Sequence, residues 1–211
     1  AEAGAELVRA MGEQQARVDG LGPEARLPVL ELCAPALQQM EADAVSTFLI
    51  RVKKIVMYDQ EVTSFEFLLM RLLRKRLEKR LRKQADQGGL VFSEEKLKGP
   101  LSQALAYIAH LGAGDEGTAR KAFDEALAQA PFIRGWCGFL PAEKLDFDKL
   151  DAGLDVLGRA PFRVRKELLQ AAAAIVTSDG TVEREEAEIL RAFAVSINCP
   201  MPPMGLGGES A

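Results

Sequence analysis

The residues of this chain best suited to chemistry are the carboxylates of two acidic turns. They are Asp59, Glu61 and Glu66 in the first turn and Asp179, Glu183 and Glu186 in the second. Oxygen ligands gathered in this way could bind a hard divalent cation, although the alternating ligands of a twelve-residue calcium loop are missing. Structural capping explains the same residues and is the favoured interpretation. Glu66 follows Thr63 by three positions, as in a capping box, and carboxylates are stabilised near helix N-termini.

No set of residues has the spacing of a hydrolytic or redox centre. A zinc-protease motif needs two histidines on one helix face, and the chain has one, His110, in an apolar stretch. We interpret His110 as a packing or helix-end residue. The cysteines Cys33, Cys137 and Cys199 have neither metal-ligand nor redox spacing, which favours a reducing compartment. We therefore expect no catalytic site and no cofactor in these residues.

A run of basic residues is the second feature that could bind a partner. Residues 71–83 hold eight basic side chains and one acidic one, while the rest keeps 19 of the 27 basic and 30 of the 31 acidic residues. The residues assigned to a basic face are Arg71, Arg74, Lys75, Lys79, Arg82 and Lys83. Such a face is either solvated or in contact with an anionic membrane surface, which contributes about 1 kcal/mol per basic residue close to it. Nucleic acid is disfavoured by the formal net charge of −4 and by the lack of interleaved aromatic residues.

The two acidic turns are the centres of a repeated pattern. Residues 55–66 and 175–186 share five identities: Ile55/Ile175, Val56/Val176, Asp59/Asp179, Val62/Val182 and Glu66/Glu186. Apolar residues at steps of three and four continue on both sides, which predicts a helix, a short turn and a second helix in each copy. The pattern therefore indicates two related helical hairpins, although two copies do not make a repeat array.

The rest of the sequence predicts further helices and no strands. A length of 211 residues with 48% apolar residues fits one all-α body of about eight or nine helices. A helix is expected to begin near Pro28 and to kink or restart at Pro35. The other expected helices cover residues 1–19, 43–58, 63–83, 101–111, 116–130, 145–157, 162–177 and a last stretch that ends near residue 198.

The expected helices group into five regions along the chain. They are a lead-in (1–22), a first helical unit (23–86), connecting helices (87–160), a second hairpin (161–200) and a flexible tail (201–211). The best internal boundary is residues 85–98, which contain Gly88 and Gly89. The longest uncharged run, residues 99–114, is too polar for a membrane-spanning helix.

Two family resemblances bear on this arrangement. The hairpins resemble the TerB-like helical module named for tellurite resistance, in which an Asp-Gly turn precedes a helix with an early Glu, as in residues 178–186, SDGTVEREE. The chain also resembles the C-terminal cytoplasmic region of bacterial membrane-bound zinc metallopeptidases of the HtpX and CAAX-prenyl-protease type. The matching stretches are residues 27–37 (LPVLELCAPAL), 65–73 (FEFLLMRLL), 190–192 (LRA) and 198–203 (NCPMPP).

The second resemblance implies a place and a role for the chain. It implies that membrane helices and a peptidase domain precede this region, that residues 1–22 connect it to the last membrane helix, and that zinc is confined to the peptidase domain. The region itself would be a non-catalytic interaction or regulatory domain on the cytoplasmic side of the bacterial inner membrane. It would bind a protein partner or a substrate segment, with the basic helix near lipid headgroups. The alternatives are a TerB-like divalent-cation-responsive sensor and a free-standing helical adaptor.

Overall fold

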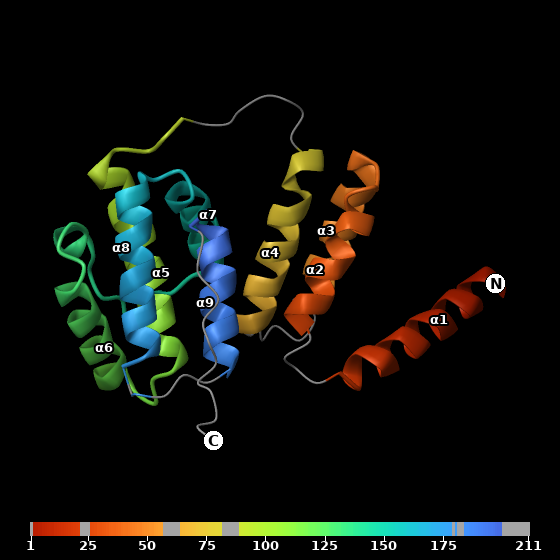
Figure 1. Ribbon diagram of the computed structural model, residues 1–211, viewed down its shortest axis with the longest axis horizontal. Helices are drawn as coiled ribbons and strands as arrows, with labels where there is room; N and C mark the ends of the chain where they lie inside the picture. The colour runs from red at the N-terminus through yellow and green to blue at the C-terminus, as the bar shows by residue number, and fades with distance from the viewer. Residues whose placement is uncertain are drawn as a thin grey trace, which may run out of the picture.

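The computed structural model describes residues 2–21, 26–56, 64–81, 89–178, 180 and 184–199. Within these ranges all regular structure is helical, with α-helices α1 to α9, two short 3-10 turns and no strand (Figure 1). The prediction of an all-α body of eight or nine helices is confirmed.

The helices fall close to the ranges that the apolar spacing predicted. Their bounds are α1 Glu2–Asp19, α2 Arg26–Leu37, α3 Ala42–Val56, α4 Ser64–Leu81, α5 Glu94–Leu111, α6 Glu116–Ala128, η2 Arg134–Trp136, η3 Ala142–Lys144, α7 Phe147–Leu157, α8 Phe162–Val176 and α9 Arg184–Ser196. The two predicted hairpins are therefore α3 with α4 and α8 with α9. The residues between the two helices of the first hairpin, 57–63, lie outside the described ranges.

Two helix boundaries differ from the prediction. α2 does not restart at Pro35 but continues through it to its end at Leu37. Pro35 lies in the last turn, where a missing N–H costs the helix a single hydrogen bond. α5 begins at Glu94 rather than near residue 101, because the Ser93 side chain accepts a hydrogen bond from the backbone N–H of Lys96 and caps the helix. Residues 94–98 are therefore helical and not part of a boundary.

The buried apolar residues form two separate cores. The larger core joins α5, α6, α7, α8 and α9, and it also receives Phe67 of α4. Among the described side chains, the smaller core has three buried residues, Val45, Leu73 and Leu77. It is surrounded by the partly buried side chains of Leu30, Leu37, Met40, Phe48, Leu49 and Val52. We call the helices around the larger core the α5–α9 bundle and those around the smaller core the α2–α4 layer.

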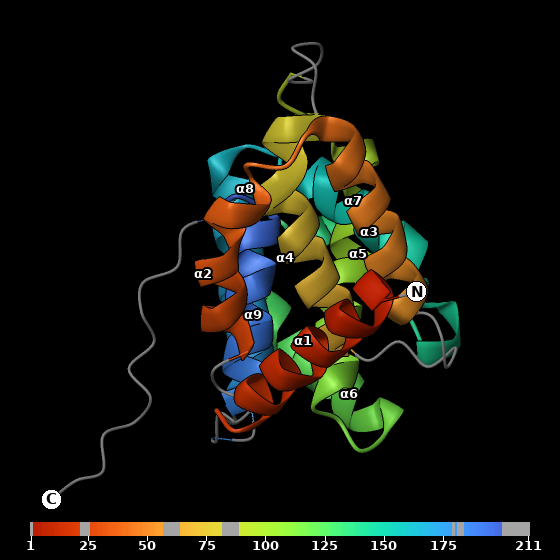
Figure 2. The same ribbon diagram turned by 90° about the vertical axis from the view of Figure 1, so that its right-hand side faces the viewer.

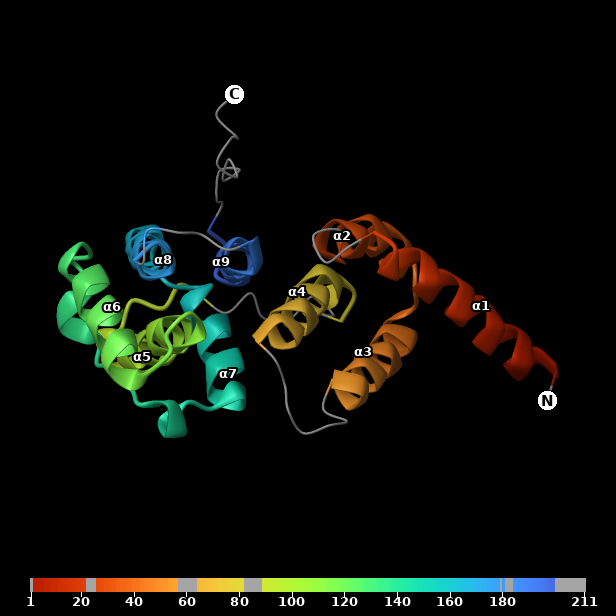
Figure 3. The same cartoon turned by 90° about the horizontal axis from the view of Figure 1, so that it is seen from below.

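Helix α4 is the element shared by the two parts. Seen from below, it lies between α2 and α3 on one side and α7 and α9 on the other (Figure 3). Figure 2 shows α2 and α3 on either side of α4. Both contact α4, and α4 in turn contacts α9, so the second helices of the two hairpins lie against each other. Because α4 has neighbours on opposite sides, two of its faces must be suited to burial.

Helix α1 stands apart from both cores. It projects from the outer side of the α2–α4 layer, away from the bundle (Figures 1 and 3). Its side chain Met11 is 63% exposed. Among the described residues, no helix is long and apolar enough to cross a lipid bilayer.

Candidate functional site

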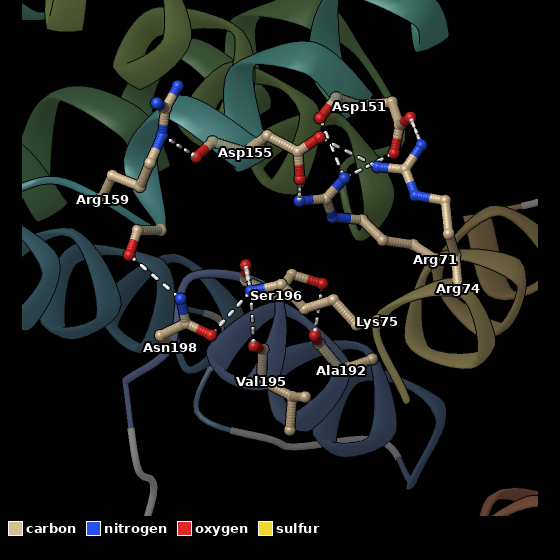
Figure 4. Close-up of polar contacts among 11 residues, drawn as sticks. Arg71, Arg74, Lys75, Asp151, Asp155, Arg159, Ala192, Val195, Ser196 and Asn198 are labelled. Atoms are coloured by element: carbon tan, nitrogen blue, oxygen red, sulfur yellow. Dashed lines mark hydrogen bonds and ion pairs between the residues drawn. The ribbon is translucent and has the colours of Figure 1, made fainter. Parts of the chain in front are cut away.

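Charged side chains of α4 connect the layer to the bundle. Arg71, Arg74 and Lys75 share one side of α4, as their spacing of three and four residues requires. Figure 4 shows Arg71 and Arg74 directed at two aspartates of α7, and Lys75 directed at the C-terminal end of α9. We call this region the junction.

Two arginines and two aspartates form a closed set of ion pairs at the junction. Arg71 Nη1 lies 2.5 Å from Asp151 Oδ1, and its Nη2 lies 2.8 Å from Asp155 Oδ1. Arg74 Nη1 lies 2.5 Å from Asp151 Oδ2, and its Nη2 lies 3.1 Å from Asp155 Oδ2. Each carboxylate therefore bridges both guanidinium groups, and each guanidinium binds both carboxylates. Charge-assisted hydrogen bonds of this kind are stronger than neutral ones and hold a defined geometry.

The burial of Arg71 makes this set necessary for the packing of α4. Its side chain has 0% of its surface exposed, whereas that of Asp151 keeps 23%. Arg71 Nη1 also donates to the backbone carbonyl of Asp151 at 2.9 Å. A buried cation without a partner would cost several kcal/mol, and removal of one aspartate leaves a single carboxylate for the two arginines. The ion pairs thus allow a charged face of α4 to lie against the bundle.

Lys75 binds the end of α9 beside this set. Its Nζ donates to the carbonyl oxygens of Ser196 at 2.5 Å and Val195 at 3.3 Å, and to Asn198 Oδ1 at 2.8 Å. The last carbonyls of a helix have no intrahelical donor, and a cation there also complements the helix dipole. Lys75, which belongs to α4 of the first hairpin, therefore caps the C-terminal end of α9 in the second hairpin.

The end of α9 is held by the bundle as well. Asn198 adopts a positive φ of 52°, a conformation that Asn tolerates better than most residues, and its Nδ2 donates to the carbonyl of Gly158 at 3.0 Å. Arg165 of α8 donates to the carbonyl oxygens of Ile197 and Asn198. The chain end that Lys75 binds is thus a fixed part of the bundle.

Three residues of the predicted basic face contact other helices of the same chain. Arg71, Arg74 and Lys75 are directed into the junction, and the buried Arg71 is not available to a membrane surface. Arg76 pairs with Glu31 of α2 at 3.2 Å. The side chains of Lys79, Arg82 and Lys83 lie outside the described residues, so their contact with an anionic surface stays a prediction.

The acidic turns are only partly described. Asp59, Asp179 and Glu183 lie outside the described residues. Glu66 lies half-buried in the first turn of α4. Glu186 lies beside Gly112 at the end of α5, where an added Cβ would be 2.7 Å from Glu186 Oε1. Within the described ranges no three His, Cys, Asp or Glu side chains are placed to hold a metal ion. Cation binding by the complete turns stays a prediction.

The structure shows the contact of His110 and the exposure of the three cysteines. His110 lies in the last turn of α5, and its Nε2 is 3.0 Å from the carbonyl oxygen of Leu140. The interpretation of His110 as a packing or helix-end residue is confirmed. Burial raises the pKa of the Cys137 thiol to about 12, so this thiol is protonated at neutral pH. Cys199 is buried and Cys33 is exposed.

The outer side of α2 is an apolar surface that sequence reasoning missed. The helix is apolar all round except for Arg26 and Glu31, yet it packs on the smaller core through one side, which carries Leu30 and Leu37. The side away from α4 carries Pro28, Leu32, Cys33, Pro35 and Ala36, all of them exposed. Leu32 is 80% exposed. We call these five residues the open face. Its sequence signal was available, because a helix without a polar face is normally covered on every side.

The comparisons with known proteins leave the junction and the open face without a precedent. No protein-family model, no curated protein and no solved structure matches this chain. The resemblance to TerB-like modules and to metallopeptidase tails therefore stays a prediction.

Proposed function

We propose that this chain is a non-catalytic helical interaction module and that the open face is its docking surface for a protein partner. The observation that carries the proposal is the exposure of an apolar helix side, with Leu32 80% exposed. Contiguous apolar surface on a folded protein is typical of interaction sites. The chemistry of the surface selects the kind of partner, because aliphatic and proline side chains bind an apolar helix or extended segment and offer no charge to a polar ligand.

The junction gives such a partner a route to the rest of the molecule. The open face belongs to α2, which contacts α4 and packs on the smaller core through Leu30 and Leu37. Helix α4 is bound to α7 and α9 by Arg71, Arg74 and Lys75. A change in the position of α2 would therefore act on α4, and through its ion pairs on the bundle. This arrangement supports a regulatory role, in which the layer receives the partner and the bundle serves as the fixed support.

The proposed setting follows from the resemblance to the metallopeptidase tails. In that setting the module lies on the cytoplasmic side of a membrane-anchored zinc metallopeptidase, the zinc is in the peptidase domain, and the partner is a protein or a substrate segment. The gene upstream of the codon for Ala1 provides a direct check. The proposal expects hydrophobic spans and a His-Glu-x-x-His motif there, and an upstream sequence that lacks both would remove the setting.

Peptide cleavage by the parent protein in lipid vesicles tests the function itself. Leu32→Glu places a charge on the open face without disturbing a buried residue, and Phe92→Glu is the matched control because Phe92 is 69% exposed in the segment before α5. The proposal expects Leu32→Glu to change the cleavage rate at least threefold, while Phe92→Glu leaves it unchanged. Equal rates for the wild type and Leu32→Glu would contradict a regulatory docking role.

A further inference from the structure

We infer that the partner on the open face is α1 from a second copy of this chain, so that two copies exchange their first helices. This inference rests on the proposed function, since it names the occupant of the same docking surface. Three observations carry it: an apolar surface that borders an incompletely covered core, an unpacked amphipathic helix, and a charge match between that helix and the layer.

The open face borders the smaller core. At 100° per residue around α2, the apolar order from Leu32 is Ala36, Val29, Cys33, Leu37 and Leu30, with Arg26 of the first turn as the one charged residue in this sector. Leu32, Ala36 and Cys33 are exposed, while Val29, Leu37 and Leu30 are partly buried. The layer consists of three helices, of which α2 and α3 each contact α4. An apolar helix on the side away from the bundle would complete a four-helix arrangement, the usual way in which such a layer closes.

Helix α1 has the shape and composition of the missing helix. Met11 and Val18 fall on one side of it, seven residues apart, and Leu7 precedes Met11 by four residues in the sequence. Met11 is 63% exposed and Val18 36% exposed. Glu6 and Glu13 occupy the opposite side together with Arg9. An amphipathic helix of 18 residues draws most of its stability from packing of its apolar side, so α1 is expected to find a cover.

The charges of α1 and of the layer are complementary. α1 carries four acidic residues, Glu2, Glu6, Glu13 and Asp19, and two basic ones, Arg9 and Arg17. α3 carries the exposed cations Arg51, Lys53 and Lys54 against a single acid, Asp43. The two helices therefore have formal net charges of −2 and +2. Opposite net charges on these two parts of the molecule favour the encounter of two copies.

The placement of α1 favours a second copy over closure on its own layer. Helix α1 leaves the layer and runs outward from it (Figures 1 and 3), and its apolar residues Met11 and Val18 are exposed. A second copy offers the same open face in return. When each copy places its α1 on the open face of the other, both open faces and both α1 helices are covered. The two contacts are related by two-fold symmetry, which limits the assembly to a dimer.

Sedimentation equilibrium of the 211-residue chain tests the dimer. The inference expects a mass of twice 23.0 kDa at micromolar concentration, and a dissociation constant raised at least tenfold by Met11→Glu on α1 or by Leu32→Glu on α2. Phe92→Glu, at an exposed apolar residue outside both surfaces, should leave the constant unchanged. Circular dichroism checks that all three variants keep their helix content. A wild-type chain that stays monomeric up to on the order of 100 µM, or a dimer that tolerates both substitutions, would overturn the inference.

Disulfide trapping identifies whose α1 covers the open face. Cys33 is an exposed thiol on that face, and Met11→Cys or Val18→Cys places a second thiol on the apolar side of α1. Mild oxidation should yield a covalent dimer that Cys33→Ser abolishes and that Arg9→Cys, on the polar side, does not form. An intrachain disulfide in a monomer would assign the face to the chain's own α1 and overturn the exchange. If the dimer fails while Leu32→Glu still alters cleavage in vesicles, the docking surface stands and only its occupant is wrong.

Discussion

The α5–α9 bundle and the α2–α4 layer bury their residues to very different extents. The bundle has a contiguous core drawn from five helices and Phe67, whereas the described side chains of the layer include three buried residues, Val45, Leu73 and Leu77. The two parts contain copies of one hairpin pattern, yet α8 and α9 lie within a closed core and α3 and α4 do not. A helical hairpin of this kind is therefore a unit that needs other helices to cover it. In the bundle the chain supplies them, whereas in the layer the described residues leave one side uncovered.

The same Leu→Ala substitution should lower the free energy of unfolding much more in the core of the bundle than in the core of the layer. Leu105 of α5 and Leu77 of α4 are both 0% exposed. Leu105→Ala should cost about 4–5 kcal/mol and Leu77→Ala about 2–3 kcal/mol, since partly buried neighbours in the layer can move into the space and reduce the cavity. Urea denaturation of both variants measures the two costs. Equal losses would mean that the layer is packed as tightly as the bundle.

Removal of one junction carboxylate should have the next largest effect. Asp151→Ala leaves the buried Arg71 with half of its ion pairs and is expected to cost about 3 kcal/mol. Hydrogen exchange should show faster opening of α3 and α4, with α5 and α8 unchanged. Asp148→Ala is the control, because Asp148 lies exposed on the same helix and takes no part in the ion pairs. A loss below about 1 kcal/mol would show that the junction contributes little to the attachment of the layer.

A smaller effect is expected from the third junction cation. Lys75→Met keeps much of the apolar stem but removes the donor to the carbonyls of Val195 and Ser196. We expect a loss of about 1–2 kcal/mol, as for a hydrogen bond to a charged group, seen as a lower melting temperature. Lys98→Met, at an exposed cation that pairs only with Glu94 within α5, is the control and should change the melting temperature little. If Lys75→Met and Lys98→Met have the same melting temperature, Lys75 does not stabilise the end of α9.

The smallest effect concerns pH and is confined to the bundle. The backbone N–H of Thr118 lowers the pKa of Asp115, which caps α6, and the backbone N–H of Lys149 lowers the pKa of Asp146, which caps α7. A folded-state pKa below the unfolded value contributes stability that is complete above about pH 4 and is lost as the pH falls through the folded pKa. Below pH 4 the starts of α6 and α7 should therefore loosen.

Two substitutions isolate this effect. Asp115→Asn and Asp146→Asn keep a capping oxygen but remove the titration, so the decline of stability between pH 5 and pH 2 should become shallower. Thermal unfolding across that range measures the slope. Variants with the slope of the wild type would assign the acid sensitivity to other carboxylates.

The apolar spacing predicted most helices because each hairpin helix has one clear buried side. Val45, Phe48, Leu49 and Val52 gave the range of α3, and the same spacing placed α8 and α9. The start of α5 was missed because a glycine and a proline, Gly99 and Pro100, obscure a helix that Ser93 caps six residues earlier. Gly153 of α7 lets the two helices approach closely at Pro100, since an added Cβ on Gly153 would lie 3.3 Å from Pro100 Cβ.

The junction could not be predicted, because each half of it looks like ordinary solvated surface. Arg71 and Arg74 belong to a basic run on α4, and Asp151 and Asp155 are spaced four residues apart on α7, about eighty residues later. Periodicity assigns charged residues to the solvent side, and only the tertiary contact shows that these charges neutralise one another. The open face is different, since the absence of a polar side on α2 was readable from residues 26–37 alone.

The reactivity of Cys33 tests most directly whether the open face is a docking surface. This exposed thiol lies on that face, while Cys137 is partly buried and Cys199 is buried, which makes them internal references. Maleimide labelling can be compared between cells that produce the natural protein and the purified chain diluted to nanomolar concentration. The account predicts labelling of Cys33 at least tenfold slower in the cells, with the other two cysteines unchanged relative to each other. Equal rates for Cys33 in both settings would contradict it.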